Sequence, residues 1–403
     1  MKQVWYINHY AGGPGLGRAY RPYLLSKELK SQEVEMTVVT STFNHLNFNQ
    51  KQCNSVPSEF ETNINYEFIK TPSYQGNGLG RLKNSLTFGF NLLKLRRSKT
   101  KPSTIVYSSP HLFGIFSAWF LAKKFNAKLI LEVRDIWPLS LIEIAGVSAF
   151  HPIVLCFKLL EKWSYKIVDH RVALLKGADK HFTKVSKKQL PFTWIPNGAD
   201  LTLKAADSLP ETIVQKFQDY KQKGFCIFGY AGALGEPNAM QQFIEAMVKQ
   251  KGAKTALFII GDGPLKNKLI KLAKQSNIST IEFFSPVTKI EALAFINNVD
   301  IAVLGWLDKS IYDYGISPNK VFDYMLCKKP ILHACSSPHD PVVSAHCGVS
   351  VKAMDASAIS SAMTEMASLS KRELNDLGEQ GYQYLIEQHD MKVLAARYKE
   401  IFN

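Results

Sequence analysis

"TALFIIGDGPLKNKL", residues 255–269, contains a strand, a tight turn and the start of a helix. Apolar and β-branched residues come first, and a Gly-Asp-Gly turn follows them. The segment "LKNKLIKLAKQ" that begins in this stretch has the apolar spacing of an amphipathic helix. The same order of strand, loop and helix recurs along the chain, and this alternation is typical of parallel sheets covered by helices.

Short apolar runs form two successive series, which predict an α/β protein with two Rossmann-like domains facing each other across a cleft. We expect the domains at 1–200 and 201–389, with a final helix, 390–403, that can pack on either. The predicted strands are 3–8, 35–41, 64–70, 104–109, 127–133, 170–175 and 192–200, then 225–234, 255–263, 281–284, 300–305, 330–334 and 349–351.

The composition is that of a basic globular protein. The 403 residues are 46% hydrophobic and 21% charged, with a net charge of +15 and a pI near 9.3. This excess indicates an anionic partner: a nucleic acid, a phosphorylated small molecule or an acidic membrane surface. No apolar window reaches about 18 residues, so no membrane span is predicted. Six cysteines without metal-ligand spacing favour a reducing, cytoplasmic location.

Ligands of open parallel sheets bind beyond the carboxyl ends of the strands, so the loops after strands are the candidates. The first, "HYAGGPGLGR", carries Gly13, Gly15 and Gly17 ahead of Arg18. Its backbone N–H groups could cradle a phosphate, or the glycines could serve a tight turn. The second strand ends "TVVTSTF" without the acidic residue that holds the ribose of NAD, which argues against NAD.

Two more loops of the first half carry polar residues directly after a strand. "LEVRDIWPLS" contains Arg134 and Asp135, which either face the cleft or form an internal salt bridge. "SSPHLFG" contains His111, which is either a ligand contact or a structural histidine.

The second half has a lysine in an unfavourable place. In "GISPNKVFDYM", residues 315–325, Ser317 is a good N-cap and Pro318 a good first helical residue. Lys320 then lies in the first helical turn, where the helix dipole disfavours a cation. Either Lys320 pairs with Asp323 on the surface, or an anion binds at this helix terminus.

Six motifs in order span nearly the whole chain: the glycine loop, "RDIWP", "IPNGAD", "YAGALG", "GDGP" and "ISPNKVFDYM". In these motifs the chain resembles a GT-B fold glycosyltransferase of family four, in the bacterial surface-polysaccharide branch that makes O-antigen and capsule. The resemblance implies transfer of a sugar from a nucleotide diphosphate, usually a UDP-sugar, to an acceptor hydroxyl with retention. It also implies that 1–200 binds the acceptor and 201–389 the nucleotide sugar.

The resemblance implies roles for individual residues. Asp135 would lie near the reacting sugar, Lys320 near the diphosphate and Asp323 on the ribose hydroxyls, and these three form the catalytic set. Contacts to the sugar or acceptor would come from His111, Arg134 and Asp313. The donor-binding set would be Gly13, Gly15, Gly17, Arg18, Gly232, Gly261, Asp262, Pro286, Val287, Ser317, Pro318, Asn319, Lys320 and Asp323.

The chain departs from the family pattern at two positions. Many relatives carry two glutamates eight positions apart, where this chain has Gly315 and Asp323. Many also carry a lysine after "YAG", near the position of Glu236 here. No metal or other cofactor is expected, and the chain has no Asp-x-Asp pair of the kind that holds a diphosphate through a divalent cation.

The segment 78–99 has the pattern of a basic amphipathic helix, with Leu79, Leu82, Leu86, Phe90 and Leu93 at helical spacing. It either lies peripherally on the anionic inner face of a membrane or covers the sheet. The expected partners are a nucleotide sugar and a glycan or lipid-linked oligosaccharide acceptor. Nucleic acid is not expected, because no known binding motif occurs. Alternative functions are a UDP-sugar 2-epimerase of the same fold and a catalytically silent scaffold for polysaccharide assembly.

Overall fold

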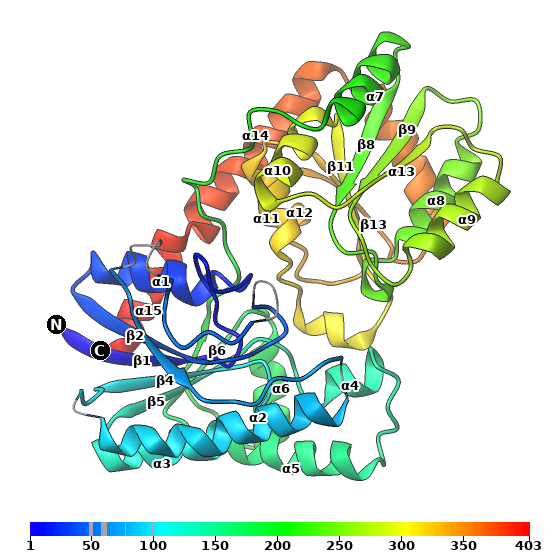
Figure 1. Cartoon of the computed structure of the whole chain (residues 1–403). Helices are drawn as coiled ribbons and strands as arrows, with labels where there is room; N and C mark the ends of the chain where they lie inside the picture. Colours follow the sequence, from blue (N-terminus) through cyan, green and yellow to red (C-terminus); the bar gives the residue numbers. More distant parts are fainter. Residues whose placement is uncertain (48–50, 58–62, 77, 99) are drawn as a thin grey trace. The chain divides into compact units, whose positions relative to one another are not determined.

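The computed structural model describes residues 1–47, 51–57, 63–76, 78–98 and 100–403. The chain forms two compact units (Figure 1). Met1–Asn197 and Met391–Asn403 make the N-terminal unit, and Gly198–Asp390 makes the C-terminal unit. The last helix of the chain therefore belongs to the N-terminal unit.

The N-terminal unit is built on a seven-stranded parallel sheet with the order β3-β2-β1-β4-β5-β6-β7. Each strand overlaps one of the predicted apolar runs, because strands buried on both faces read as continuous apolar sequence. The strands are β1 (Lys2–Ile7), β2 (Val34–Ser41), β3 (Asn65–Ile69), β4 (Thr104–Ser109), β5 (Lys128–Val133), β6 (His170–Ala173) and β7 (Phe192–Trp194).

Helices cover both faces of this sheet (Figure 1). Alternate residues of β1 enter different cores: Val4 and Tyr6 pack with α1 (Arg21–Lys30) and α15 (Met391–Phe402), whereas Trp5 and Ile7 lie in the opposite core. That opposite side carries α2 (Leu79–Asn91), the 3-10 helix η2 (Leu92–Arg97), α3 (Ile115–Phe125), α5 (Pro152–Ile167) and α6 (Ala178–Ser186), with the short α4 (Leu139–Glu143) before α5.

The C-terminal unit repeats the plan with a six-stranded parallel sheet, order β10-β9-β8-β11-β12-β13. Its strands are β8 (Cys226–Ala231), β9 (Thr255–Ile260), β10 (Ile281–Phe284), β11 (Ile301–Gly305), β12 (Ile331–Ala334) and β13 (Gly348–Val351). Its helices are α7 (Glu211–Gln222), η3 (Glu236–Asn238), α8 (Met240–Lys249), α9 (Lys266–Gln275), α10 (Lys289–Asn298), η4 (Ser310–Tyr314), α11 (Asn319–Leu326), α12 (Pro341–Ser344), α13 (Ala356–Ser368) and α14 (Lys371–His389).

In both sheets the direction in which successive strands are added reverses once, and the position of this reversal indicates where a ligand can bind. The chain runs outward from β1 to β3 and then returns to β4, so a switch point lies between β1 and β4. The equivalent point of the C-terminal unit lies between β8 and β11. In such sheets the ligand crevice opens at the carboxyl ends of the strands beside the switch point. The predicted fold class, α/β with two Rossmann-like sheets, is confirmed.

The predicted cap of α11 is wrong by one residue. Pro318, rather than Ser317, is the N-cap, and it stays extended with φ −78° and ψ 134°. Because Pro318 is itself extended, the first helical residue is Asn319. Lys320 is consequently the second helical residue instead of the third.

In the described part of the chain, every helix is too short or too polar to cross a lipid bilayer. The predicted helix 78–99 is α-helical only to Asn91 and continues as the 3-10 helix η2 to Arg97; residue 99 lies outside the described residues.

Candidate functional site

The loops that follow β8 and β9 lie against each other at the carboxyl edge of the C-terminal sheet. The N–H of Gly232 donates to the carbonyl of Ile260 (2.9 Å), and the N–H of Leu234 to that of Asp262 (2.8 Å). A Cβ atom added to Gly261 would lie 1.9 Å from the carbonyl oxygen of Gly232. Glycine at position 261 is therefore required for the close approach of the two loops.

Lys320, from the first turn of α11, reaches these loops. Its Nζ lies 2.9 Å from Oδ1 of Asn238 and 5.4 Å from the centroid of the Tyr230 ring. A Cβ atom on Gly232 would stand 2.1 Å from Cε of Lys320, so only glycine leaves room for the lysine stem. Burial lowers the pKa of Lys320 to about 8, although the charge of Asp323 opposes the shift. The switch point thus holds a partly desolvated cation.

Asp323 lies on the same helix as Lys320 and forms an ion pair with Lys289 at the start of α10. The Asp323 side chain is 20% exposed. Burial raises the pKa of its carboxyl, and Lys289 and Lys320 act in the opposite direction. Nζ of Lys289 donates a hydrogen bond to Oδ2 of the Asp323 carboxylate. A cation and a carboxylate are therefore placed one helical turn apart at this edge.

The remaining predicted donor residues of this unit surround the same edge. Lys266 ties two loops together, because its Nζ donates to the carbonyls of Gly261 (2.9 Å) and Phe284 (3.0 Å). Asp262 is exposed, and its carboxylate accepts from the N–H of Gly263 (2.8 Å). The other predicted residues follow β10 or precede α11: Pro286 and Asn319, which are exposed, and Val287, Ser317 and Pro318, which are half-buried.

Gly315 stands where the resembled family has its first glutamate, and its backbone explains part of that departure. Its φ of +113° lies in the region that favours glycine, so a side chain would be strained there. Asp313, which was predicted to contact the sugar or acceptor, is exposed on η4 and lies outside α11.

The glycine loop of the N-terminal unit is folded on itself. The N–H groups of Gly13 and Gly17 each donate to the carbonyl of the other, at 3.1 Å and 3.3 Å, and the N–H of Arg18 donates to Leu46 (3.0 Å). Gly13 and Gly15 have φ values of +145° and +69°. These N–H groups are engaged within the protein and are not available to a phosphate in this conformation, whereas the Arg18 side chain is exposed.

His111 pairs with His9 at the switch point of the N-terminal sheet. Nδ1 of His9 lies 2.6 Å from Nε2 of His111, and the loops after β1 and β4 supply one histidine each. The outer nitrogens, Nε2 of His9 and Nδ1 of His111, are buried without a hydrogen-bond partner. Burial lowers the pKa of His111 to about 3 and that of His9 well below its usual value. The pair is neutral, and both histidines are buried between the loops after β1 and β4.

Arg134 and Asp135 follow β5, half-buried and exposed respectively. The ion pairs found among the described residues do not include one between them. The buried ion pair of this region joins Glu132 to Arg21 instead (3.4 Å), and Tyr6 and Ser108 donate to Glu132 at 2.8 Å. Asp135 and Arg134 therefore lie at the carboxyl edge of the sheet beside a rigid buried network.

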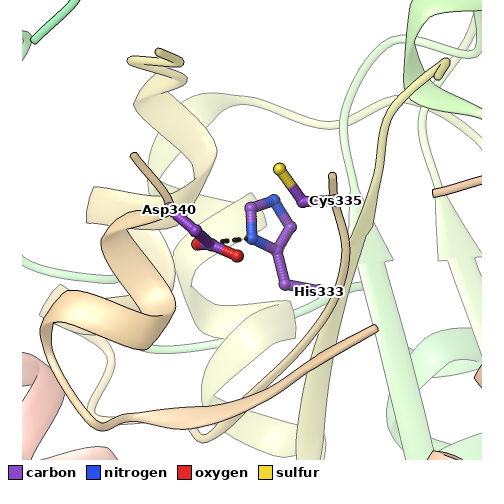
Figure 2. A group of neighbouring side chains, drawn as sticks. All are labelled: His333, Cys335 and Asp340. Carbon is purple, nitrogen blue, oxygen red and sulfur yellow. Dashed lines mark hydrogen bonds and ion pairs between the residues drawn. The ribbon is translucent and has the colours of Figure 1, made fainter. Parts of the chain in front are cut away.

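One cluster in the described part of the C-terminal unit has the composition of a metal site: His333, Cys335 and Asp340 (Figure 2). Its atoms already serve other contacts. Nδ1 of His333 bonds Asp340 (2.8 Å), and Nε2 of His333 accepts from Trp306 (2.8 Å). Asp340 also accepts from Ser350 (2.5 Å), and burial raises the pKa of the Cys335 thiol to about 12. The cluster is therefore a structural hydrogen-bonded network at the end of β12.

Comparison with known proteins relates this architecture to sugar transferases. A model of the family described as "Glycosyl transferases group 1" matches residues 226–368, which begin at β8 and include α11. A curated relative, the probable glycosyltransferase WbjE of Pseudomonas aeruginosa, is 22% identical over 290 residues, covering 68% of each chain.

Two solved structures share the whole fold. The Anabaena protein HepE, solved in complex with UDP-glucose, aligns with a TM-score of 0.65 at 12% identity, covering 100% of this chain and 99% of its own. WaaG, a glycosyltransferase involved in lipopolysaccharide biosynthesis, aligns with a TM-score of 0.64 at 14% identity, covering 99% of both chains. The two-sheet architecture is the GT-B fold. Residues 226–368 are a glycosyl transferase group 1 domain, and the chain is a glycosyltransferase.

Proposed function

We propose that the protein transfers a sugar, with retention at the anomeric carbon, from a UDP-sugar to a glycan or lipid-linked acceptor in surface-polysaccharide synthesis. One observation carries the donor site: Lys320 is held between Asn238 and Gly232 at the switch point of the C-terminal sheet. A desolvated lysine at a helix N-terminus has the chemistry to bind a diphosphate. In this proposal the donor binds to the C-terminal unit, Gly198–Asp390, and the acceptor to the N-terminal unit.

The relatives support both ends of the reaction. HepE was solved with UDP-glucose, which supports a uridine diphosphate donor. WaaG acts in lipopolysaccharide biosynthesis, which supports a lipid-linked glycan as acceptor. Such an acceptor places the enzyme in the cytoplasm, on the inner face of the membrane.

Charge stabilisation of the leaving group is the chemical task of the site. When the sugar departs, negative charge develops on the β-phosphate, and Lys320 with the first N–H groups of α11 meets that charge. No metal is needed in this scheme. Losing one such donor costs about 10²–10³ in rate. Asp323 accepts hydrogen bonds from the ribose hydroxyls while its Oδ2 stays paired with Lys289. Asp135 and His111 contact the transferred sugar or the acceptor.

The proposal is tested by incubating the protein with UDP-, GDP-, ADP- and dTDP-sugars, with and without lipid-linked glycan acceptors. Released nucleotide is measured by mass spectrometry and the anomeric configuration of the product by NMR. We expect acceptor-dependent release of UDP and a product with the donor's configuration.

Two variants test the donor site, and the products formed by the wild-type protein separate the alternative functions. Lys320→Ala and Asp323→Ala should each abolish turnover, and near-normal rates in both would refute the site. A new UDP-sugar isomer formed without acceptor would identify an epimerase. Binding of UDP without any turnover across the acceptor panel would identify the scaffold.

A further inference from the structure

Exposed apolar side chains are concentrated on one side of the N-terminal unit. Among the described residues, 16 large hydrophobic side chains are exposed, and ten of them lie between positions 79 and 159. Phe150 and Leu159 are 86% and 72% exposed. Six residues from α3, α5 and the turn before α5 form what we call the α3–α5 face: Phe116, Phe120, Phe150, Ile153, Leu155 and Leu159.

The α3–α5 face is continuous. The ring of Phe116 on α3 stacks on Trp163 of α5, with centroids 5.8 Å apart, and Trp119 meets the same indole edge-on at 5.9 Å. Helices α2, α3 and α5 all cover the same side of the sheet (Figure 1). On α2, Leu79 and Phe90 are 83% and 76% exposed, so part of the predicted apolar stripe of 78–99 extends the surface.

The exposed charges of α2, α3 and α5 are all positive, although the neighbouring α6 carries the exposed Asp179. Between Glu67 and Glu132 the sequence contains no acidic residue and 11 lysines and arginines. Lys123 and Lys124 are exposed at the end of α3, and Lys162 and Lys166 are exposed on α5. The acid of α5, Glu161, is buried against His181. The exposed surface of these helices therefore combines apolar side chains with cations alone.

The combination of exposed apolar and basic side chains distinguishes among the possible partners of the α3–α5 face. Protein interfaces are depleted in lysine, which makes a protein partner a poor match. A second copy of the chain would bring two basic surfaces together, and like charges oppose that contact. An anionic lipid bilayer offers phosphate groups to the lysines and an apolar boundary to the phenylalanines and leucines.

We propose that the α3–α5 face, together with the exposed apolar residues of α2, docks on an anionic lipid bilayer. Phe150 and Leu159 enter the boundary between headgroups and acyl chains, and Lys123, Lys124 and Lys162 contact the lipid phosphates. The proposal goes beyond sugar transfer and does not rest on the donor site, so either can fail without the other.

The first test is co-flotation of the full chain with vesicles of phosphatidylcholine, with or without phosphatidylglycerol. We expect binding only to the anionic vesicles, weakening as salt is raised. Lys123→Gln/Lys124→Gln/Lys162→Gln should weaken binding about fivefold per lysine. The matched control is Lys249→Gln/Lys251→Gln/Lys268→Gln on the C-terminal unit, where all three lysines are exposed and no loss is expected.

The apolar part is tested with Phe150→Ser/Leu159→Ser, which should lose vesicle binding by tenfold or more. Val343→Ser, at a 56% exposed site of the C-terminal unit, should leave binding unchanged. Affinity for UDP is measured in parallel for every variant. It should not change, since none of these residues belongs to the donor site, and retained UDP binding also shows that the variants fold.

Cys156 provides a direct probe, because it is exposed on the outer side of α5. An environment-sensitive fluorophore on Cys156 should shift to the blue when anionic vesicles are added. The same label on Val343→Cys in a Cys156→Ser background should not respond. Indifference to lipid charge, unchanged flotation of Phe150→Ser/Leu159→Ser, or a solution dimer that these substitutions dissociate would each overturn the proposal.

Discussion

Lys320 is a cation whose charge depends on pH near neutrality. Because burial lowers its pKa to about 8, the free protein carries this charge below pH 8 and loses it above. A diphosphate binds the protonated form, so we expect affinity for UDP to fall as the pH rises through about 8. Lys320→Arg, which stays protonated, should bind UDP with a flat profile between pH 7 and 9.5.

Binding also raises the pKa of a lysine that meets an anion, so protons are taken up when UDP binds near pH 8.5. Titration calorimetry in buffers of different ionisation enthalpy measures this uptake. Wild-type protein should take up a fraction of one proton and Lys320→Arg none. Equal uptake by both proteins would exclude Lys320 as the titrating group.

Asn238 acts through Lys320 and is a positioning residue. Asn238→Ala removes the 2.9 Å hydrogen bond to Nζ, and we expect turnover to fall roughly tenfold, in line with about 1.5 kcal/mol for a hydrogen bond to a charged group. Asn238→Asp would place a carboxylate beside the lysine, so the decline in UDP affinity should move to higher pH. An unmoved pH profile in Asn238→Asp would show that position 238 does not act through Lys320.

At the scale of elements, the β8–α11 contact depends on a single glycine. In Gly232→Ala the new methyl would lie 2.1 Å from the Lys320 stem, so the lysine must leave and UDP binding should be lost. Gly252→Ala is the matched control, since Gly252 has φ +90° and nothing lies within 4 Å of an added Cβ.

Both substitutions should lower the free energy of unfolding by about 1 kcal/mol or more, because alanine is strained at positive φ. The comparison requires UDP titration and thermal unfolding of both variants. Loss of UDP binding in Gly252→Ala, or retained UDP binding in Gly232→Ala, would show that the contact between Gly232 and Lys320 is not needed for donor binding.

The sequence predicted the strands because buried parallel strands read as apolar runs. It also marked Lys320 as a misplaced cation. It could not predict the partner of that lysine, because Asn238 is 82 residues away and no local pattern distinguishes it from the neighbouring Glu236. His9 was missed for the same reason, since its partner His111 comes from the other side of the switch point. Proximity across a sheet edge follows from strand order, which local patterns do not encode.

At the scale of the whole molecule, α15 returns the end of the chain to the N-terminal unit. Leu394 and Tyr398 are buried in its core, and the Tyr398 hydroxyl donates to buried Glu132. Deleting residues 391–403 should therefore expose one face of the N-terminal sheet. Hydrogen exchange should accelerate across β1, β2 and β4, while protection of 198–390 persists. Unchanged exchange in the N-terminal sheet would contradict this assignment of α15.

The central claim is that the Lys320 edge of the C-terminal unit binds the diphosphate of the donor. The most direct test is calorimetric titration of UDP and of uridine into wild type, Lys320→Ala and the control Lys328→Ala, whose lysine is exposed and pairs with Glu379. The account predicts that Lys320→Ala loses UDP affinity by tenfold or more, binds uridine as wild type does, and that Lys328→Ala changes neither. Equal UDP affinity in Lys320→Ala and wild type would contradict it.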